Sequence, residues 1–211
     1  MIVEGEEDKF AIIQLMKHHT DWPTDRTKVP VWIKAEGSPT DILAQGFIRA
    51  KLKESGTKTL GIVFDADEQF ENRWRRIRQI SEKVFDEVPE GMPKGGLILQ
   101  NDESRLGVWI MPDNAGHGML ETFLRELIAD RHRHLIEYAG EVVAEARRKG
   151  ADCKECHTHK SEIHSWLAWQ DPPGQALGRA ITSLTLDPHA ESAKPFVRWV
   201  LDLYGLKAKD V

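Results

Sequence analysis

The stretch TLGIVFDAD, residues 59–67, decides the fold that the sequence predicts. Residues 59–64 form a short run that is nearly all apolar and rich in side chains that favour strands. A run that is apolar on both faces is typical of a central strand in a parallel sheet covered by helices. The stretch ends in Asp65 and Asp67, at the edge where open parallel sheets carry their sites. We therefore expect one central strand that delivers acids to a functional edge.

Strand-like and helix-like segments alternate around this stretch. Strand signals occur at residues 2–3, 29–35, 59–64, 96–100 and 106–111, and the last two segments read as a hairpin. Helical patterns occur at about residues 6–21, 39–54, 70–86, 119–133, 135–149 and 194–204. This order predicts an α/β fold with a mostly parallel sheet flanked by helices over residues 1–115. Residues 116–211 are expected to form a helical C-terminal region packed on that domain.

The composition is that of an ordered protein. Of the 211 residues, 40% are hydrophobic and 30% are charged, which excludes a disordered chain. The net charge of −5 argues against a surface that grips nucleic acid non-specifically. There is no apolar run long enough for a membrane helix, and the opening MIVEGEED lacks the pattern of a secretory signal. We expect a cytoplasmic protein with no membrane partner.

Four acids stand where strands end or helices begin. Glu4 closes the first strand, Asp8 follows about one helical turn later, and Asp65 and Asp67 close the third strand. Carboxylates that converge without a cation raise one another's pKa values, and a hard divalent ion removes that conflict. A set of oxygen ligands favours magnesium or manganese over zinc. The alternative is that each acid is a solvated loop residue or a helix cap.

The order of these acids resembles a known domain. Val3-Glu4-Gly5 with Asp8, followed some sixty residues later by Asp65-Ala66-Asp67, is similar to the signature of the Toprim domain. That domain occurs in topoisomerases, bacterial primases, recombination proteins and the overcoming-lysogenization-defect nucleases. The resemblance covers roughly residues 1–115.

The second half of the chain extends the resemblance. The stretches GVWIMPDN at 107–114, GMLE at 118–121 and IHSWLAWQ at 163–170 resemble small stand-alone Toprim-related proteins of bacteria and archaea. A topoisomerase is not implied, because Tyr138 and Tyr204 both lie in predicted helices. Nor does the sequence contain the zinc domain of a primase or the ATPase domain of the larger nucleases.

The resemblance implies a magnesium-dependent nuclease that hydrolyses phosphodiester bonds, with Mn²⁺ as the alternative ion and DNA favoured over RNA. Nucleic-acid processing or defence against foreign DNA is the implied setting. Glu4 would be a ligand or a general acid or base, and Lys160 would steady the charged transition state. The implied metal ligands are Glu4, Asp8, Asp65, Asp67 and Glu121, with Asp113 as a further candidate for the downstream acid.

A second function class stays open from the sequence alone. The small size and the acidic balance favour a non-catalytic or regulatory module that binds a metal, a nucleotide or a partner protein. The complete set of acids favours the nuclease. Convergence of Lys160 and Glu121 on the acids would strengthen the catalytic interpretation.

Two weaker patterns have a structural and a functional interpretation each. Arginines 73, 75, 76 and 78 follow the Asp-x-Asp motif, and they form either a phosphate groove or, as we favour, a solvated helix face. The loop with Cys153, Cys156, His157 and His159 has a spacing that could hold zinc. We expect a reduced, partly exposed loop there instead, because four ligands from one tight loop are cramped.

Overall fold

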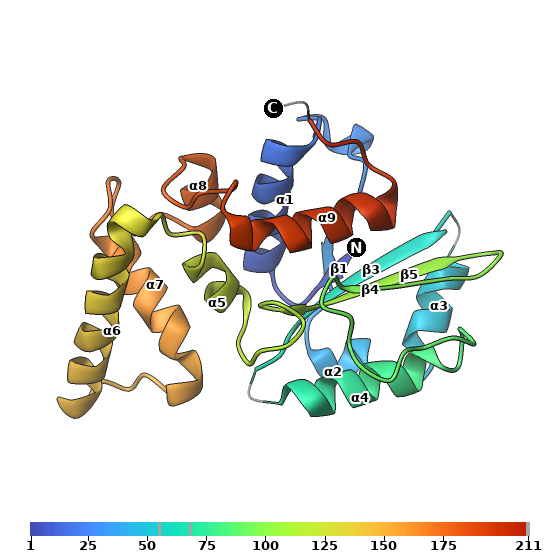
Figure 1. The fold of residues 1–211 in the computed structure, drawn as a ribbon, viewed down its shortest axis with the longest axis horizontal. Helices are drawn as coiled ribbons and strands as arrows, with labels where there is room; N and C mark the ends of the chain where they lie inside the picture. Colours follow the sequence, from blue (N-terminus) through green and yellow to red (C-terminus); the bar gives the residue numbers. More distant parts are fainter. Residues whose placement is uncertain (55, 68, 210–211) are drawn as a thin grey trace.

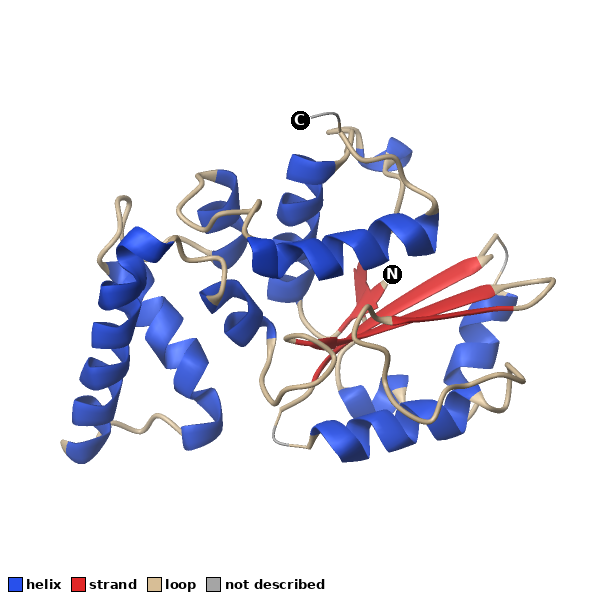
Figure 2. Ribbon diagram, in the orientation of Figure 1, coloured by secondary structure: helices blue, strands red, loops and turns tan. Residues whose placement is uncertain are grey.

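The computed structural model describes residues 1–54, 56–67 and 69–209. It shows a five-stranded sheet with helices on both faces and a helical C-terminal part, as the sequence predicts (Figures 1 and 2). The strand order is β2-β1-β3-β5-β4, in which only β4 runs antiparallel to its neighbour. Within the described ranges, none of the helices has the length and apolar character that crossing a bilayer requires.

The predicted central strand is confirmed. Strand β3 (Thr59–Asp65) pairs with β5 (Arg105–Met111) along its whole length, from Thr59 opposite Arg105 to Asp65 opposite Met111. The short strand β1 (Ile2–Val3) lies on its other side, and β4 (Leu97–Gln100) forms the expected hairpin with β5. This seven-pair register fixes where Asp65 leaves the sheet.

The second strand is much shorter than predicted. Only Lys34–Ala35 (β2) pairs with β1, and a short 3-10 helix, Arg26–Lys28, precedes it. Val31 and Ile33 are nevertheless buried while Trp32 between them is exposed. The apolar alternation of this segment therefore reflects packing of a loop against the core, and Pro30 has no N–H to give to a ladder.

Two predicted helices are interrupted. The segment expected at 39–54 splits into α2 (Pro39–Ile42) and α3 (Phe47–Lys53), because Gly46 between them adopts a left-handed φ of 86°. The segment expected at 119–133 forms α5 (Leu120–Arg125) and, after a break, a short 3-10 helix at Asp130–His132. The carbonyl of Leu127 turns instead to the N–H of Asp187, which commits this stretch to a tertiary contact.

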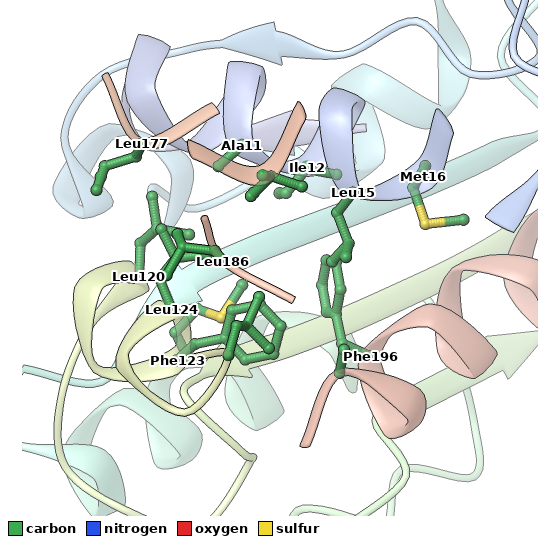
Figure 3. Close-up of a cluster of buried hydrophobic side chains, with 14 of the residues drawn as sticks. Ala11, Ile12, Leu15, Met16, Leu120, Phe123, Leu124, Leu177, Leu186 and Phe196 are labelled. Atoms are coloured by element: carbon green, nitrogen blue, oxygen red, sulfur yellow. The ribbon is translucent and has the colours of Figure 1, made fainter. Parts of the chain in front are cut away.

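Each face of the sheet has its own hydrophobic core. One core lies under α2, α3 and α4 (Phe70–Ser81), which cover the same face in Figure 1. The other core lies under α1 (Glu6–His19), α5 and α9 (Lys194–Tyr204). Figure 3 shows residues of α1 facing Leu120 and Leu124 of α5 and Phe196 of α9. The C-terminal region thus shares with α1 the cover of one face of the sheet.

The remaining helices lie beyond α5 in Figure 1. They are α6 (Arg133–Arg148), α7 (Thr158–Ala168) and α8 (Leu177–Thr182). Helix α8 packs closely on α1, where a Cβ added at Gly178 would lie 3.2 Å from the backbone of Phe10. Helix α7 buries Ile163, Trp166 and Leu167 in the core that α1 and α5 share. This packing brings α1, α5 and α7 to one edge of the sheet.

Close approach of α9 to the sheet requires glycine in β5. A Cβ at Gly107 would collide with the buried side chain of Leu203. We predict that Gly107→Ala lowers the free energy of unfolding by about 1–3 kcal/mol, because overpacking displaces α9. Urea unfolding would measure the loss. Gly91→Ala is the matched control, since nothing lies within 4 Å of its Cβ position. Equal destabilisation by both substitutions would contradict the proposed packing.

Candidate functional site

Acidic side chains meet at the carboxyl edge of the parallel strands. Glu4 follows β1 directly and Asp65 is the last residue of β3. Helix α1 begins just after β1 and carries Asp8 in its first turn, while α5 follows β5 and carries Glu121 in its first turn. Because β1, β3 and β5 are parallel, their following loops lie at the same edge.

Backbone N–H groups hold three of these carboxylates in place. Oε1 of Glu4 accepts from the N–H of Asp65 at 3.0 Å, which links the ends of β1 and β3. Oδ1 of Asp65 accepts from the N–H of Leu120 at 2.9 Å, one of the free donors in the first turn of α5. Oδ2 of Asp8 accepts from the N–H of Gly5 at 3.0 Å and caps α1. Each contact uses one carboxylate oxygen.

Asp65 lies at the electrostatic centre of the group. Removal from water raises the pKa of Asp65 to about 9. After burial, the causes of this shift are the negative charges of Asp8, Glu4, Glu121 and Asp67. Five acids from four segments of the chain therefore influence one another electrostatically, but in the described ranges no three of them place ligand atoms within 4.8 Å of one another.

The neighbours of Asp65 share its environment. Burial raises the pKa of Glu4 to about 7, against the hydrogen bond from Asp65 and the charge of Arg73, which both lower it. Burial also raises the pKa of Asp8 to about 6, with a further contribution from Glu121. Near neutral pH, some of these carboxyl groups therefore hold protons.

Asp67 takes a different position from Asp65. Its side chain is 52% exposed, and its Oδ2 lies 2.8 Å from the guanidinium of Arg73. Its φ of 52° is left-handed, and its backbone exchanges two hydrogen bonds with Gly118 just before α5. The charge of Asp67 still raises the pKa values of Asp65 and Glu4. Asp67 thus lies at the rim, balanced by an arginine.

The two candidates for the downstream acid are clearly separated by the structure. Glu121 is buried, and its charge acts on both Asp65 and Asp8. Asp113 instead accepts from the N–H groups of Ala115 and Gly116, at 3.1 and 2.7 Å, and so closes its own turn. The hydrogen bonds described for Asp113 stay within that turn. The geometry favours Glu121 as the downstream acid over Asp113.

Lys160 of α7 reaches the same edge. Its Nζ lies 2.8 Å from Oε1 of Glu121 and 3.4 Å from Oε2 of Glu7. Burial disfavours the ammonium, but the hydrogen bond with Glu121 and the two acidic charges outweigh it and raise the pKa of Lys160. The sequence-based pairing of Lys160 with the acids therefore has a geometric basis.

Glu7 and His164 were not predicted as site residues from the sequence. Glu7, Glu121 and His164 each offer a ligand atom within 4.8 Å of the others, and they are the one group of three found in the described ranges. The signal in the sequence is the spacing of four between Lys160 and His164, which places both on one face of α7. The sequence instead makes Glu7 a surface acid at the start of a helix.

The weaker patterns divide as follows. Of the arginines on α4, Arg73 and Arg76 line a 520 Å³ groove beside Asp67, whereas Arg78 pairs with Glu82.

The loop with the possible zinc ligands is not assembled as a metal site. The thiols of Cys153 and Cys156 are both free. Sγ of Cys153 accepts from Arg147 at 3.1 Å, and Nδ1 of His159 lies 2.9 Å from Oγ1 of Thr122. In the described chain these residues do not form a preassembled zinc site.

The raised pKa of Asp65 predicts an unusual pH dependence of stability. The folded chain keeps this proton between about pH 4 and pH 9, where the unfolded chain has lost it. The contribution of this protonated carboxyl group to the free energy of unfolding is complete below about pH 4 and is lost as the pH rises toward 9. Asp65→Asn should flatten this decline and, near pH 8, stabilise the protein by roughly 1–3 kcal/mol.

Urea unfolding in EDTA over this pH range measures the effect. Asp113→Asn is the matched control, because its amide oxygen can still accept from the same turn. Parallel stability curves for wild type and Asp65→Asn would show that Asp65 ionises normally.

Comparisons with known proteins place the chain in a family. The family described as "Protein of unknown function (DUF3226)" matches residues 1–205, which include both the sheet and the helical region. No curated protein and no solved structure matches the chain. Because the match spans nearly the whole sequence, the chain belongs to the DUF3226 family.

Proposed function

We propose that this protein is a Toprim-type phosphodiesterase that uses a divalent cation, Mg²⁺ or Mn²⁺, to hydrolyse nucleic acid. The observation that carries the proposal is the hydrogen bond from the N–H of Asp65 to the carboxylate of Glu4, which joins the ends of β1 and β3 beside the partly buried side chain of Asp65. The residues proposed to hold the cation are Asp65, Glu4, Asp8 and Glu121, with Asp67 at the rim.

The donor set fits a hard divalent cation. It consists of carboxylate oxygens, which suit magnesium and manganese better than zinc. Without a cation, a carboxyl group with a pKa of about 9 stays protonated at neutral pH and offers a poor ligand. A bound divalent ion neutralises this repulsion, and its chemistry is to polarise a phosphoryl oxygen and help water to ionise.

Residues of the chain supply the other requirements of phosphodiester hydrolysis. Glu4 has a pKa of about 7, which suits a group that takes and returns a proton near neutral pH. Lys160 presents a partly exposed ammonium beside Glu121, where it can stabilise negative charge that develops on a phosphate. Arg73 and Arg76 line the groove beyond Asp67 and can position flanking phosphates.

A second candidate is a regulatory module that binds an ion without catalysis. Two ion pairs favour it, because Arg73 already balances Asp67 and Lys160 already balances Glu121. Asp67 is the half-exposed partner of its pair, whereas Arg73 is only 13% exposed, so a phosphate would replace the Asp67 carboxylate beside a largely buried guanidinium. Convergence of Lys160 and Glu121 on the acids leads us to prefer the enzyme.

Cation binding is the first test of the site. We predict that saturating Mn²⁺ or Mg²⁺ raises the melting temperature of the wild type by several degrees near pH 8, because binding at about 100 times Kd stabilises by roughly 2.7 kcal/mol. Asp65→Asn should lose this shift, since the amide cannot neutralise the ion. Asp113→Asn should keep it, because Asp113 closes its own turn. Retention of the shift in Asp65→Asn would place the ion elsewhere.

Cleavage of plasmid and single-stranded DNA with Mn²⁺ tests the chemistry. We predict that Asp65→Asn and Lys160→Ala each lower the rate by about 100-fold or more, through loss of the ion and of transition-state charge stabilisation. Asp113→Asn should cleave like the wild type. Equal cleavage by the wild type and Asp65→Asn would remove the proposed chemistry, and cation binding without any cleavage would favour the regulatory module.

A further inference from the structure

A groove along α1, separate from the carboxylates, combines cations with exposed aromatic rings. It has a volume of 250 Å³ and lies between α1 and the segment that precedes β2. The lining residues that matter are Lys9, Lys17, Arg26, Phe10, Trp22 and Trp32. Neither the fold nor the proposed hydrolysis accounts for this combination.

The aromatic rings are held at the surface by buried neighbours. Trp32 is 68% exposed, while Val31 and Ile33 on either side are only 4% and 6% exposed. Phe10 is 48% exposed, and the next two residues of α1, Ala11 and Ile12, are buried. The backbone positions of both rings are therefore fixed although the rings face solvent. Aromatic side chains of this size are usually buried, so two exposed rings beside one groove indicate a binding surface.

The charge of the groove opposes that of the chain. Lys9 and Lys17 lie eight residues apart on α1, roughly 12 Å along its axis, and Arg26 contributes from the facing segment. None of the described lining residues is acidic, although the net charge of the chain is −5. Lys17 and Arg26 form no ion pair with a described residue. Lys9 pairs with Glu6, which is 60% exposed, so that pair is weak and exchangeable.

We propose that this groove binds single-stranded nucleic acid. Bases would stack on Trp32 and Phe10, and their phosphates would pair with Lys17, Arg26 and Lys9. A duplex hides its base faces, so it could use only the cations. An acidic peptide would likewise leave the rings unused, whereas alternating bases and phosphates match both features of the groove.

The groove also points toward the carboxylates. Phe10 and Gln14 line a second cavity of 550 Å³, which extends along α8 to Glu7. Glu7 is the residue that shares Lys160 with Glu121. A strand seated on Trp32 would thus pass Phe10 and reach the site. This route to the carboxylates rests on the proposed hydrolysis, but the binding itself does not.

Fluorescence anisotropy of a short fluorescein-labelled oligothymidylate, measured with the full chain in EDTA, tests binding without turnover. Trp32→Ala should weaken binding by about tenfold, because one stacked base is lost. Trp32→Phe should restore much of the affinity if Trp32 acts through its ring. The matched control is Trp169→Ala, which removes an exposed tryptophan that packs against Tyr138 and does not line the groove.

Salt dependence separates stacking from charge. Each lost phosphate contact lowers the slope of log affinity against log salt by about 0.7, so Lys17→Ala with Arg26→Ala should lower it by about 1.4. The control is Lys53→Ala with Lys83→Ala, which removes two exposed lysines away from the groove. Equal slopes for the two double variants would overturn the proposal.

Two further outcomes identify the occupant and separate this inference from the proposed hydrolysis. Polyglutamate should not displace the oligonucleotide, and a duplex of the same length should bind more weakly. Displacement by polyglutamate, together with normal binding by Trp32→Ala, would assign the groove to acidic polypeptides and overturn the proposal. Binding in EDTA proceeds without the cation, so it is measured separately from cleavage. Absence of cleavage with intact binding would therefore count against the hydrolysis alone.

Discussion

Burial of Asp65 among other carboxylates is the constraint on which the rest of the site depends. Asp65 cannot move away from these carboxylates, because β3, which ends in Asp65, pairs with β5 over seven consecutive residues. The N–H of Leu120 then holds one of its oxygens toward α5. A fold that satisfied stability alone would place an apolar or amide side chain there. The cost of ionising Asp65 marks this position as a place where function opposes stability.

The helical C-terminal region both covers the sheet and carries two residues of the site. Helix α9 covers the sheet by its close approach to Gly107, while Tyr204 at its end accepts a hydrogen bond from the N–H of Gly61 in β3. Helices α5 and α7 pack in the same core and carry Glu121 and Lys160 to the acids. The packing that stabilises the sheet is therefore also the packing that assembles the site. The family match over residues 1–205 includes both the sheet and these helices.

The sequence correctly predicts those parts of the fold that a short stretch of residues determines. The apolar run before Asp65 identifies the central strand, and the parallel order of strands brings Glu4 and Asp65 to one edge. Features that depend on distant packing are not predicted in this way. The loop before β2 has a strand-like alternation because its side chains alternate between core and solvent without a pairing partner.

The same distinction applies to the site residues. Glu7 and His164 gain their meaning from the packing of α7 on α5 and α6, which brings Lys160 and His164 near Glu7 of α1 and which no local pattern records. The resemblance ranks Glu121 above Asp113 as the downstream acid, and the structure adds that a tight turn uses the carboxylate of Asp113 whereas the charge of Glu121 acts on Asp65. Spacing along the chain could not separate these two, because the difference lies in which backbone N–H groups each carboxylate meets.

Helix α1 connects the carboxylates with the basic groove, and its own electrostatics account for part of that arrangement. Acids in its first turn and Lys17, His18 and His19 in its last turn both complement the helix dipole. The dipole therefore explains why the charges of α1 are segregated. It does not explain Trp32 or Phe10, which gain nothing from a dipole and lose stability by facing water. Nor does it explain Arg26, which belongs to a different segment. Rings and cations from two segments converge on one groove, and the single strand of nucleic acid that we propose for it would offer flat faces to the rings and negative charge to the cations.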